Sequence, residues 1–109
     1  MSSLVPFNPP TEFLLDNHFA YVICFALHGP QTAYADFLQE MQEFDAWLHY
    51  VDNAWIVLSR RPLVSISSSL RSKIRTGDWL MVMPAKGPVD GWLPRDAWDW
   101  INRHIPKEW

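Results

Sequence analysis

The 109-residue sequence contains a single cysteine, Cys24, so no disulfide can form within the chain. It has no hydrophobic run near the roughly 20 residues that a membrane-spanning helix requires. Its first residues lack the basic start and the long apolar region of a secretion signal. We therefore expect a cytoplasmic protein that does not enter a membrane.

Basic residues are also few. The chain has nine Lys and Arg and twelve Asp and Glu, so its formal net charge is −3. Strong non-specific binding to nucleic acid usually needs a pronounced basic surface, so the overall charge argues against it. One segment differs and holds five of the nine basic residues: Arg60, Arg61, Arg71, Lys73 and Arg75. If these side chains converge, they could contact phosphates. The alternative is a solvated helix face.

The common catalytic motifs are missing, including the nucleophile elbow, the phosphate-binding glycine loop and the dinucleotide fingerprint. The four histidines, His18, His28, His49 and His104, show no spacing typical of a metal site. His28 follows the first predicted strand, where functional residues often lie, but it also suits a plain turn. We predict no metal and no cofactor.

Hydrophobic residues are abundant, at 49% of the chain, and there are seven tryptophans. A chain of this length can build one hydrophobic core but not two. The prolines Pro6, Pro9 and Pro10 discourage regular structure near the start. We therefore predict an N-terminal arm over residues 1–18 and a single domain over residues 19–109.

Hydrophobic periodicity predicts the elements of this domain. A continuous apolar run at 19–27 indicates a buried strand, and two aromatic and β-branched runs around Asp52-Asn53 indicate a hairpin. The predicted elements are strand 19–27, helix 32–44, strands 46–51 and 54–58, helix 63–74, strand 78–83 and a last helix starting near Pro94. This order predicts an α+β fold, an α/β sandwich of ferredoxin-like βαββαβ type with an extra C-terminal helix.

Tryptophans crowd the C-terminal segment. Trp98 falls on the predicted apolar face of the last helix with Ile101 and Ile105, whereas helical geometry directs Trp100 elsewhere. Tryptophan is favoured at the centres of interfaces. We therefore take Trp92, Trp100 and Trp109 as candidate interface residues.

A resemblance to a known family rests on the hairpin, which reads Trp47-Leu48-His49-Tyr50-Val51-Asp52-Asn53-Ala54-Trp55-Ile56-Val57. It resembles the hairpin of SinR-like bacterial proteins, small relatives of the CRISPR adaptation subunit of the Cas-two type. The approach to Gly77-Asp78 and the tail from Gly91 to Trp100 are similar too, so the resemblance covers about residues 19–104. It implies a ferredoxin-like domain that pairs as a homodimer.

In nuclease-active members of that family, metal-dependent cleavage relies on an aspartate at the end of the first strand. This chain reads Phe25-Ala26-Leu27 there, and Ala26 has no oxygen that could bind a hard cation. The resemblance therefore implies the family fold without the family's metal ligand.

We accordingly expect a non-catalytic, homodimeric interaction or scaffold protein with a protein or nucleic-acid partner. One alternative is a metal-dependent nuclease with a rearranged site that uses Asp52, Asp78 or Asp90. His49, which matches the family's hairpin histidine, could then transfer protons near neutral pH, or it could simply form a hydrogen bond within the sheet. A further alternative is a nucleic-acid-binding module without cleavage.

Overall fold

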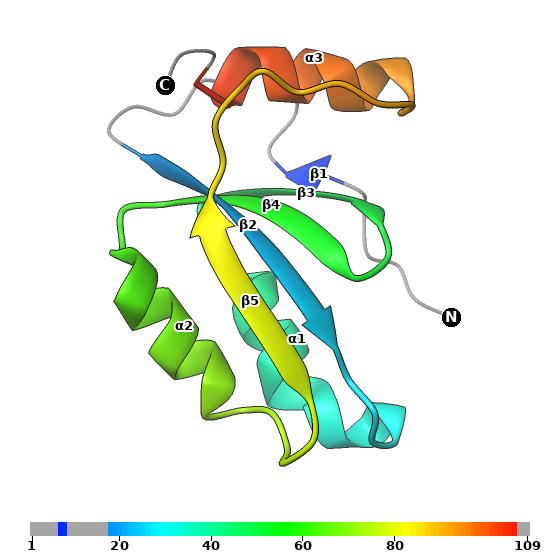
Figure 1. The fold of residues 1–109 in the computed structure, drawn as a ribbon, viewed down its shortest axis with the longest axis vertical. Helices are drawn as coiled ribbons and strands as arrows, with labels where there is room; N and C mark the ends of the chain where they lie inside the picture. The colour runs from blue at the N-terminus through cyan, green and yellow to red at the C-terminus, as the bar shows by residue number, and fades with distance from the viewer. Residues whose placement is uncertain (1–6, 9–17, 107–109) are drawn as a thin grey trace.

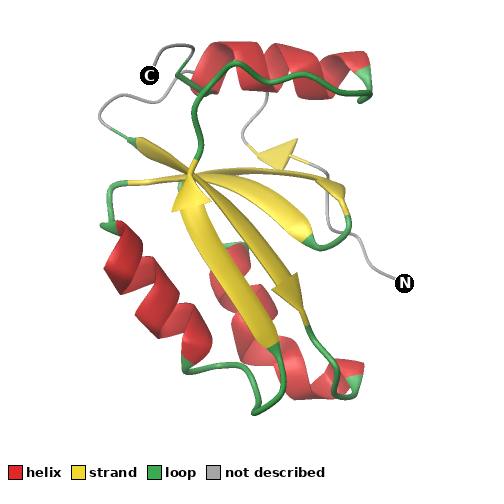
Figure 2. Ribbon diagram, in the orientation of Figure 1, coloured by secondary structure: helices red, strands yellow, loops and turns green. Residues whose placement is uncertain are grey.

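The computed structural model describes residues 7–8 and 18–106. Within these residues the chain forms one antiparallel sheet, three α-helices and a short 3-10 helix (Figures 1 and 2). The predicted α+β class is therefore confirmed. Most of the predicted arm lies outside the described residues, but two of its residues form a short strand that the sequence did not predict.

The described strands are β1 Phe7–Asn8, β2 Phe19–Ala26, β3 Ala46–Val51, β4 Ala54–Ser59 and β5 Trp79–Pro84. They lie in the order β1-β3-β4-β2-β5, and all neighbouring strands are antiparallel. The predicted hairpin is present as β3 and β4. The strand β5 therefore lies at one edge of the sheet and the short β1 at the other.

The helices are η1 Gln31–Tyr34, α1 Ala35–Met41, α2 Leu63–Arg71 and α3 Arg95–His104. The serines of α2 give it low helix propensity, and two fully buried side chains, Ile66 and Leu70, pack it against the sheet. Gly77 follows with a φ of +96°, a conformation that glycine adopts without a Cβ clash. Among the described helices, none has the length and apolar character needed to cross a membrane.

One face of the sheet is covered by α1 and α2, which lie behind and to the left of it in Figure 1. The core on this face is aromatic, and the rings of Trp47 and Trp55 lie 5.2 Å apart between centroids. Tyr21 and Ile23 of β2 point into it at alternate positions, as expected of a strand. The buried members are Tyr21, Ile23, Tyr34, Phe37, Met41, Phe44, Trp47, Trp55, Val57, Ile66 and Leu70.

The opposite face carries α3, which crosses the upper end of the sheet (Figure 1). Its buried residues are Ala97, Trp100 and Ile101, which follow the i, i+3, i+4 spacing of one helix face. Trp100 has no exposed surface, so the prediction that it points away from the core is wrong. The apolar stripe is centred between Trp100 and Ile101, and Trp98 lies at its partly buried margin.

Candidate functional site

The predicted basic cluster divides into two groups in the structure. Arg61 donates a hydrogen bond from Nη1 to Oε2 of Glu40 at 3.2 Å, and Lys73 donates to the other carboxylate oxygen. The Glu40 side chain is only 6% exposed. Arg61 and Lys73 therefore neutralise a buried carboxylate between α1 and α2, which argues against them as phosphate ligands.

The neighbours of Glu40 stabilise the ionised form of its carboxyl group. Burial on its own would raise the pKa of this carboxyl group, but hydrogen bonds from Lys73, Ser69 and Arg61 and the positive charge of Lys73 outweigh it. The pKa of Glu40 therefore lies below its ordinary value. The carboxylate stays ionised at neutral pH and keeps both cations in place.

The second group consists of Arg71 and Arg75, whose side chains are exposed. Within the described residues neither guanidinium pairs with a carboxylate. Both line a groove of about 540 Å³ between the end of α2 and the start of β5, together with Ser67, Thr76 and Trp79. Arg60, also exposed, lies just beyond the end of β4 and does not line this groove.

Asp78 joins the loops beside this groove. Its carboxylate accepts hydrogen bonds at 2.8 Å from the backbone N–H groups of His28 and Arg75 and from the Tyr34 hydroxyl. Burial would raise the pKa of Asp78, but these hydrogen bonds and the neighbouring His28 hold it below the ordinary value. Its oxygens are thus engaged within the fold, which argues against Asp78 as a free metal ligand.

The other candidates for catalysis lie apart from the groove. His49 stacks on the buried Trp55 ring at 4.3 Å between centroids, and its Nε2 lies 2.9 Å from the Asp52 carbonyl oxygen. Asp52 belongs to the exposed β3–β4 turn, and Asp90 accepts a hydrogen bond from the Gly91 N–H in a distant loop. Among the described residues, no three His, Cys, Asp or Glu side chains gather where they could hold a metal ion.

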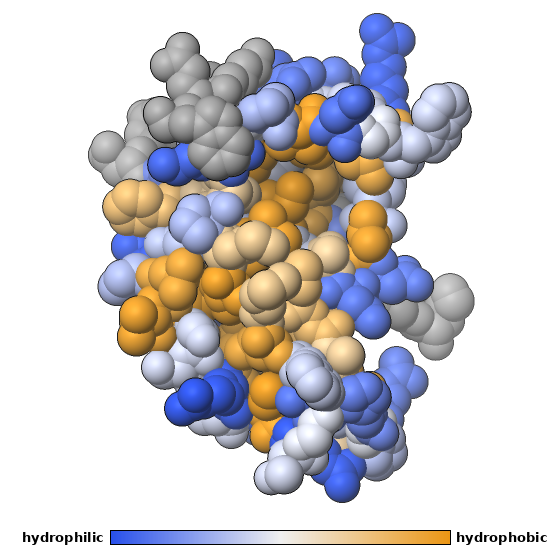
Figure 3. Space-filling model, viewed as in Figure 1, coloured by the Kyte–Doolittle hydropathy of each residue, from blue (hydrophilic) through white to orange (hydrophobic). Residues whose placement is uncertain are grey.

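A second feature is a part of the sheet, on the face that carries α3, that α3 leaves wholly or partly exposed. Cross-strand partners form three rows there: Ile56–Val22–Met83, Ala54–Cys24–Met81 and Ala26–Trp79. We call these eight residues the open face. Met81 and Met83 on β5 are 53% and 39% exposed, and in Figure 3 hydrophobic residues spread over the middle of this side of the molecule.

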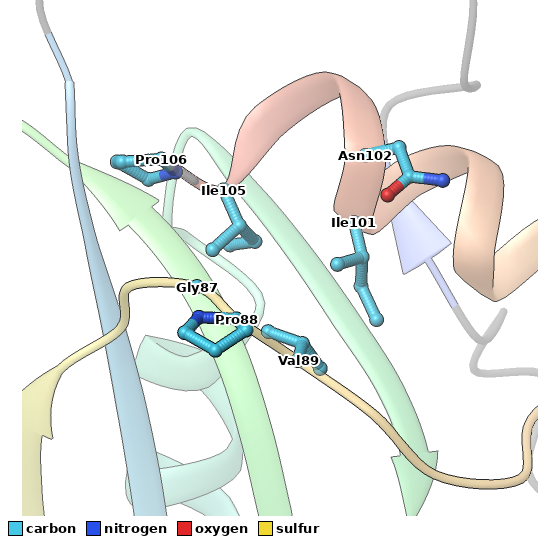
Figure 4. A pocket seen from close by; sticks show the side chains of 7 residues that line it. All are labelled: Gly87, Pro88, Val89, Ile101, Asn102, Ile105 and Pro106. Carbon is cyan, nitrogen blue, oxygen red and sulfur yellow. The ribbon is translucent and has the colours of Figure 1, made fainter. Parts of the chain in front are cut away.

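A further hollow of about 310 Å³ lies between α3 and the loop before it (Figure 4). Its lining is mainly apolar, and Asn102 provides the one polar side chain among the residues Gly87, Pro88, Val89, Ile101, Asn102, Ile105 and Pro106. Because no ionisable side chain lines it, this hollow offers no group for acid–base chemistry.

Of the predicted interface residues, Trp92 is 98% exposed in the loop before α3, and Trp109 lies outside the described residues. The groove residues Ser67, Thr76 and Trp79 were not predicted as a site. Their only sequence signal was proximity to Arg71 and Arg75, because their convergence depends on how α2 returns to β5.

Comparison with known proteins gives no relative, because no family model, curated protein or solved structure matches the chain.

Proposed function

We propose that the chain is a non-catalytic interaction protein of ferredoxin-like type that forms a homodimer through the open face. The observation that carries the proposal is the row of exposed apolar side chains on β5 beside the half-buried Val22 and Cys24 of β2. The order strand-helix-strand-strand-helix-strand, with β2 and β4 at the centre of the sheet, supports the ferredoxin-like assignment. The SinR-like relationship and the cytoplasmic location stay predictions.

Three properties favour a second copy of this chain as the partner. All eight residues of the open face are uncharged, so the face offers no charge complementarity to an acidic or basic protein. An apolar face is compatible with itself, and two sheets can pack face to face about 10 Å apart. The face also extends onto the edge strand β5, so no described strand of the same sheet lies beyond it to obstruct a second copy.

Met81→Asp tests this arrangement, because it places a carboxylate in the middle row of the open face. We expect the unaltered chain to sediment as a dimer at micromolar concentration and Met81→Asp to sediment as a monomer. An unpaired charge buried in each copy should weaken dimerisation by more than about a hundredfold. Circular dichroism checks that the variant remains folded.

The matched control is Val64→Asp, since Val64 is an apolar residue 70% exposed on α2, away from the open face. It should leave the dimer intact. A monomeric unaltered chain, or equal dissociation by Val64→Asp, would contradict the proposal. Dissociation by Trp92→Asp alone would place the interface at the loop before α3 instead.

The nuclease alternative has weaker support. Asp52, Asp78 and Asp90 lie in separate loops, and Asp78 is engaged by three donors. Ala26 ends β2, opposite Trp79. Cleavage of RNA or duplex DNA that requires Mg²⁺ or Mn²⁺ and disappears on replacing one of these aspartates would favour the nuclease over the interaction protein.

A further inference from the structure

We propose that His104 and His18 form an acid-sensitive latch, which keeps α3 packed on the sheet at neutral pH and releases it when His104 takes up a proton. His104 is the last residue of α3, and His18 directly precedes β2. Neither histidine is among the eight residues of the open face, so the latch does not depend on the proposed dimer.

The ring of His104 lies against the buried side of α3. Its centroid is 4.8 Å from that of Trp100, which has no exposed surface. Its Nε2 atom is buried and has no hydrogen-bond partner among the described residues. In the protonated ring this nitrogen carries a hydrogen and needs an acceptor. Protonation of His104 would therefore place an unpaired cation under the helix, which costs free energy as long as α3 stays packed.

His18 differs from His104 because a carboxylate accompanies it. Its Nε2 lies 2.9 Å from Oδ2 of Asp45, the residue before β3, and its side chain is only 4% exposed. It stands two residues before Ala20, which packs in the same cluster as the buried residues of α3. A positive charge on His18 is thus paired with Asp45, whereas a positive charge on His104 has no such partner in the described part of the chain.

Both described charges that act on His104 oppose its protonation. Burial lowers the pKa of His104 below its ordinary value of 6.5, and Arg103 and His18 lower it further. Asp45 is engaged by His18, and Lys86, which lines a groove beside His18, adds no negative charge. The folded chain therefore binds this proton less readily than the opened chain. The packing of α3 is fully stable above pH 6.5 and weakens as the pH falls towards the lower folded-state pKa.

A plainer account treats His104 as an ordinary residue of a helix end. It lies with Arg103 in the last turn of α3, where a positive charge interacts favourably with the helix dipole. That account predicts tighter packing of α3 on acidification, because protonation would add a favourable charge. The latch predicts the opposite change, so the pH dependence of α3 distinguishes the two accounts.

Hydrogen–deuterium exchange of the full chain, corrected for intrinsic exchange rates, measures the local opening of α3. The range from about pH 7.5 to about pH 5 covers the ordinary titration of histidine. We expect the opening equilibrium constant of the α3 amides to rise by up to about tenfold for each pH unit below 6.5, the limit for one proton. The amides of α2 should change little, because the contribution of Glu40 is fully present above pH 4.5.

Two variants remove the titrating group: His104→Gln, and His104→Phe, which keeps a flat ring beside Trp100. In both, the opening of α3 should be the same at the two ends of the pH range. The matched control is His28→Gln, since the His28 side chain is 59% exposed and should not contribute. It should keep the full pH effect. His18→Gln should show a smaller effect, because it removes a positive charge that acts on His104.

Three outcomes would overturn the proposal: opening of α3 that is independent of pH in the unaltered chain, a pH effect that persists in both His104 variants, or an equal rise in α2, which would indicate a general loss of stability. Greater protection of α3 at acidic pH would overturn it in favour of the helix-dipole account. The dimer is tested separately, because Met81→Asp keeps both histidines and its α3 should respond to pH as in the unaltered chain.

Discussion

Replacing Glu40 by glutamine removes the one buried charge on which two cations converge. Arg61, Ser69 and Lys73 all donate to this carboxylate. Breaking a fully buried ion pair costs about 3–5 kcal/mol. Arg61 and Lys73 are 40% and 32% exposed, so water can partly replace the lost carboxylate, and the expected loss of unfolding free energy is reduced to about 1–3 kcal/mol.

Urea unfolding followed by tryptophan fluorescence measures this loss as a lower midpoint at an unchanged slope. Glu43→Gln is the matched control, because Glu43 lies just beyond the same helix, is exposed and accepts a hydrogen bond only from Gln39 at 3.2 Å. The control should shift the unfolding free energy by less than about 0.5 kcal/mol.

The difference in unfolding free energy between the unaltered chain and Glu40→Gln should also depend on pH. The pKa of Glu40 in the folded chain lies below its ordinary value of 4.5. Its contribution is therefore fully present above pH 4.5 and is lost as the pH falls through the folded-state pKa. The difference in unfolding free energy between the unaltered chain and Glu40→Gln should shrink on acidification. A difference that is absent at neutral pH, or that stays constant down to strongly acidic pH, would refute this reasoning.

Two further substitutions test the packing and the backbone. Trp100→Ala should lower the free energy of unfolding by about 3–5 kcal/mol, because the side chain has no exposed surface under α3; a near-neutral effect in thermal unfolding would contradict its place in the core. Gly77→Ala should cost about 1–2 kcal/mol, since the φ of +96° lies where a Cβ is unfavourable although open space surrounds it. A loss below about 0.3 kcal/mol in urea unfolding would show that the turn changes its conformation.

Elements with a strong local signal were predictable from the sequence. The apolar run that became β2 (Phe19–Ala26), and the two-residue turn Asp52-Asn53 between two β-branched and aromatic runs, were predicted close to their observed bounds. The helix predicted at 32–44 is shorter in the structure. This segment begins with the 3-10 helix η1, and the α-helix that follows, α1, ends at Met41. Local propensity and periodicity determine the type of an element better than its ends.

The candidate sites depend on contacts between distant residues, which no local pattern records. The sequence predicted Lys73 as part of a basic cluster. In the fold it lies instead at Glu40, thirty-three positions earlier in the chain. Trp100 looked exposed because a helical stripe can be centred on either of two neighbouring positions, and only packing against the sheet selects one.

The sequence by itself therefore determined most of the strands and helices and the absence of a disulfide within the chain. The tertiary structure decided which charges are neutralised within the fold, such as those of Arg61 and Lys73 at Glu40, and which apolar residues α3 leaves exposed. The physical reason is that short-range steric and turn preferences act within a few residues. Burial and charge pairing depend on the whole arrangement of the chain in space.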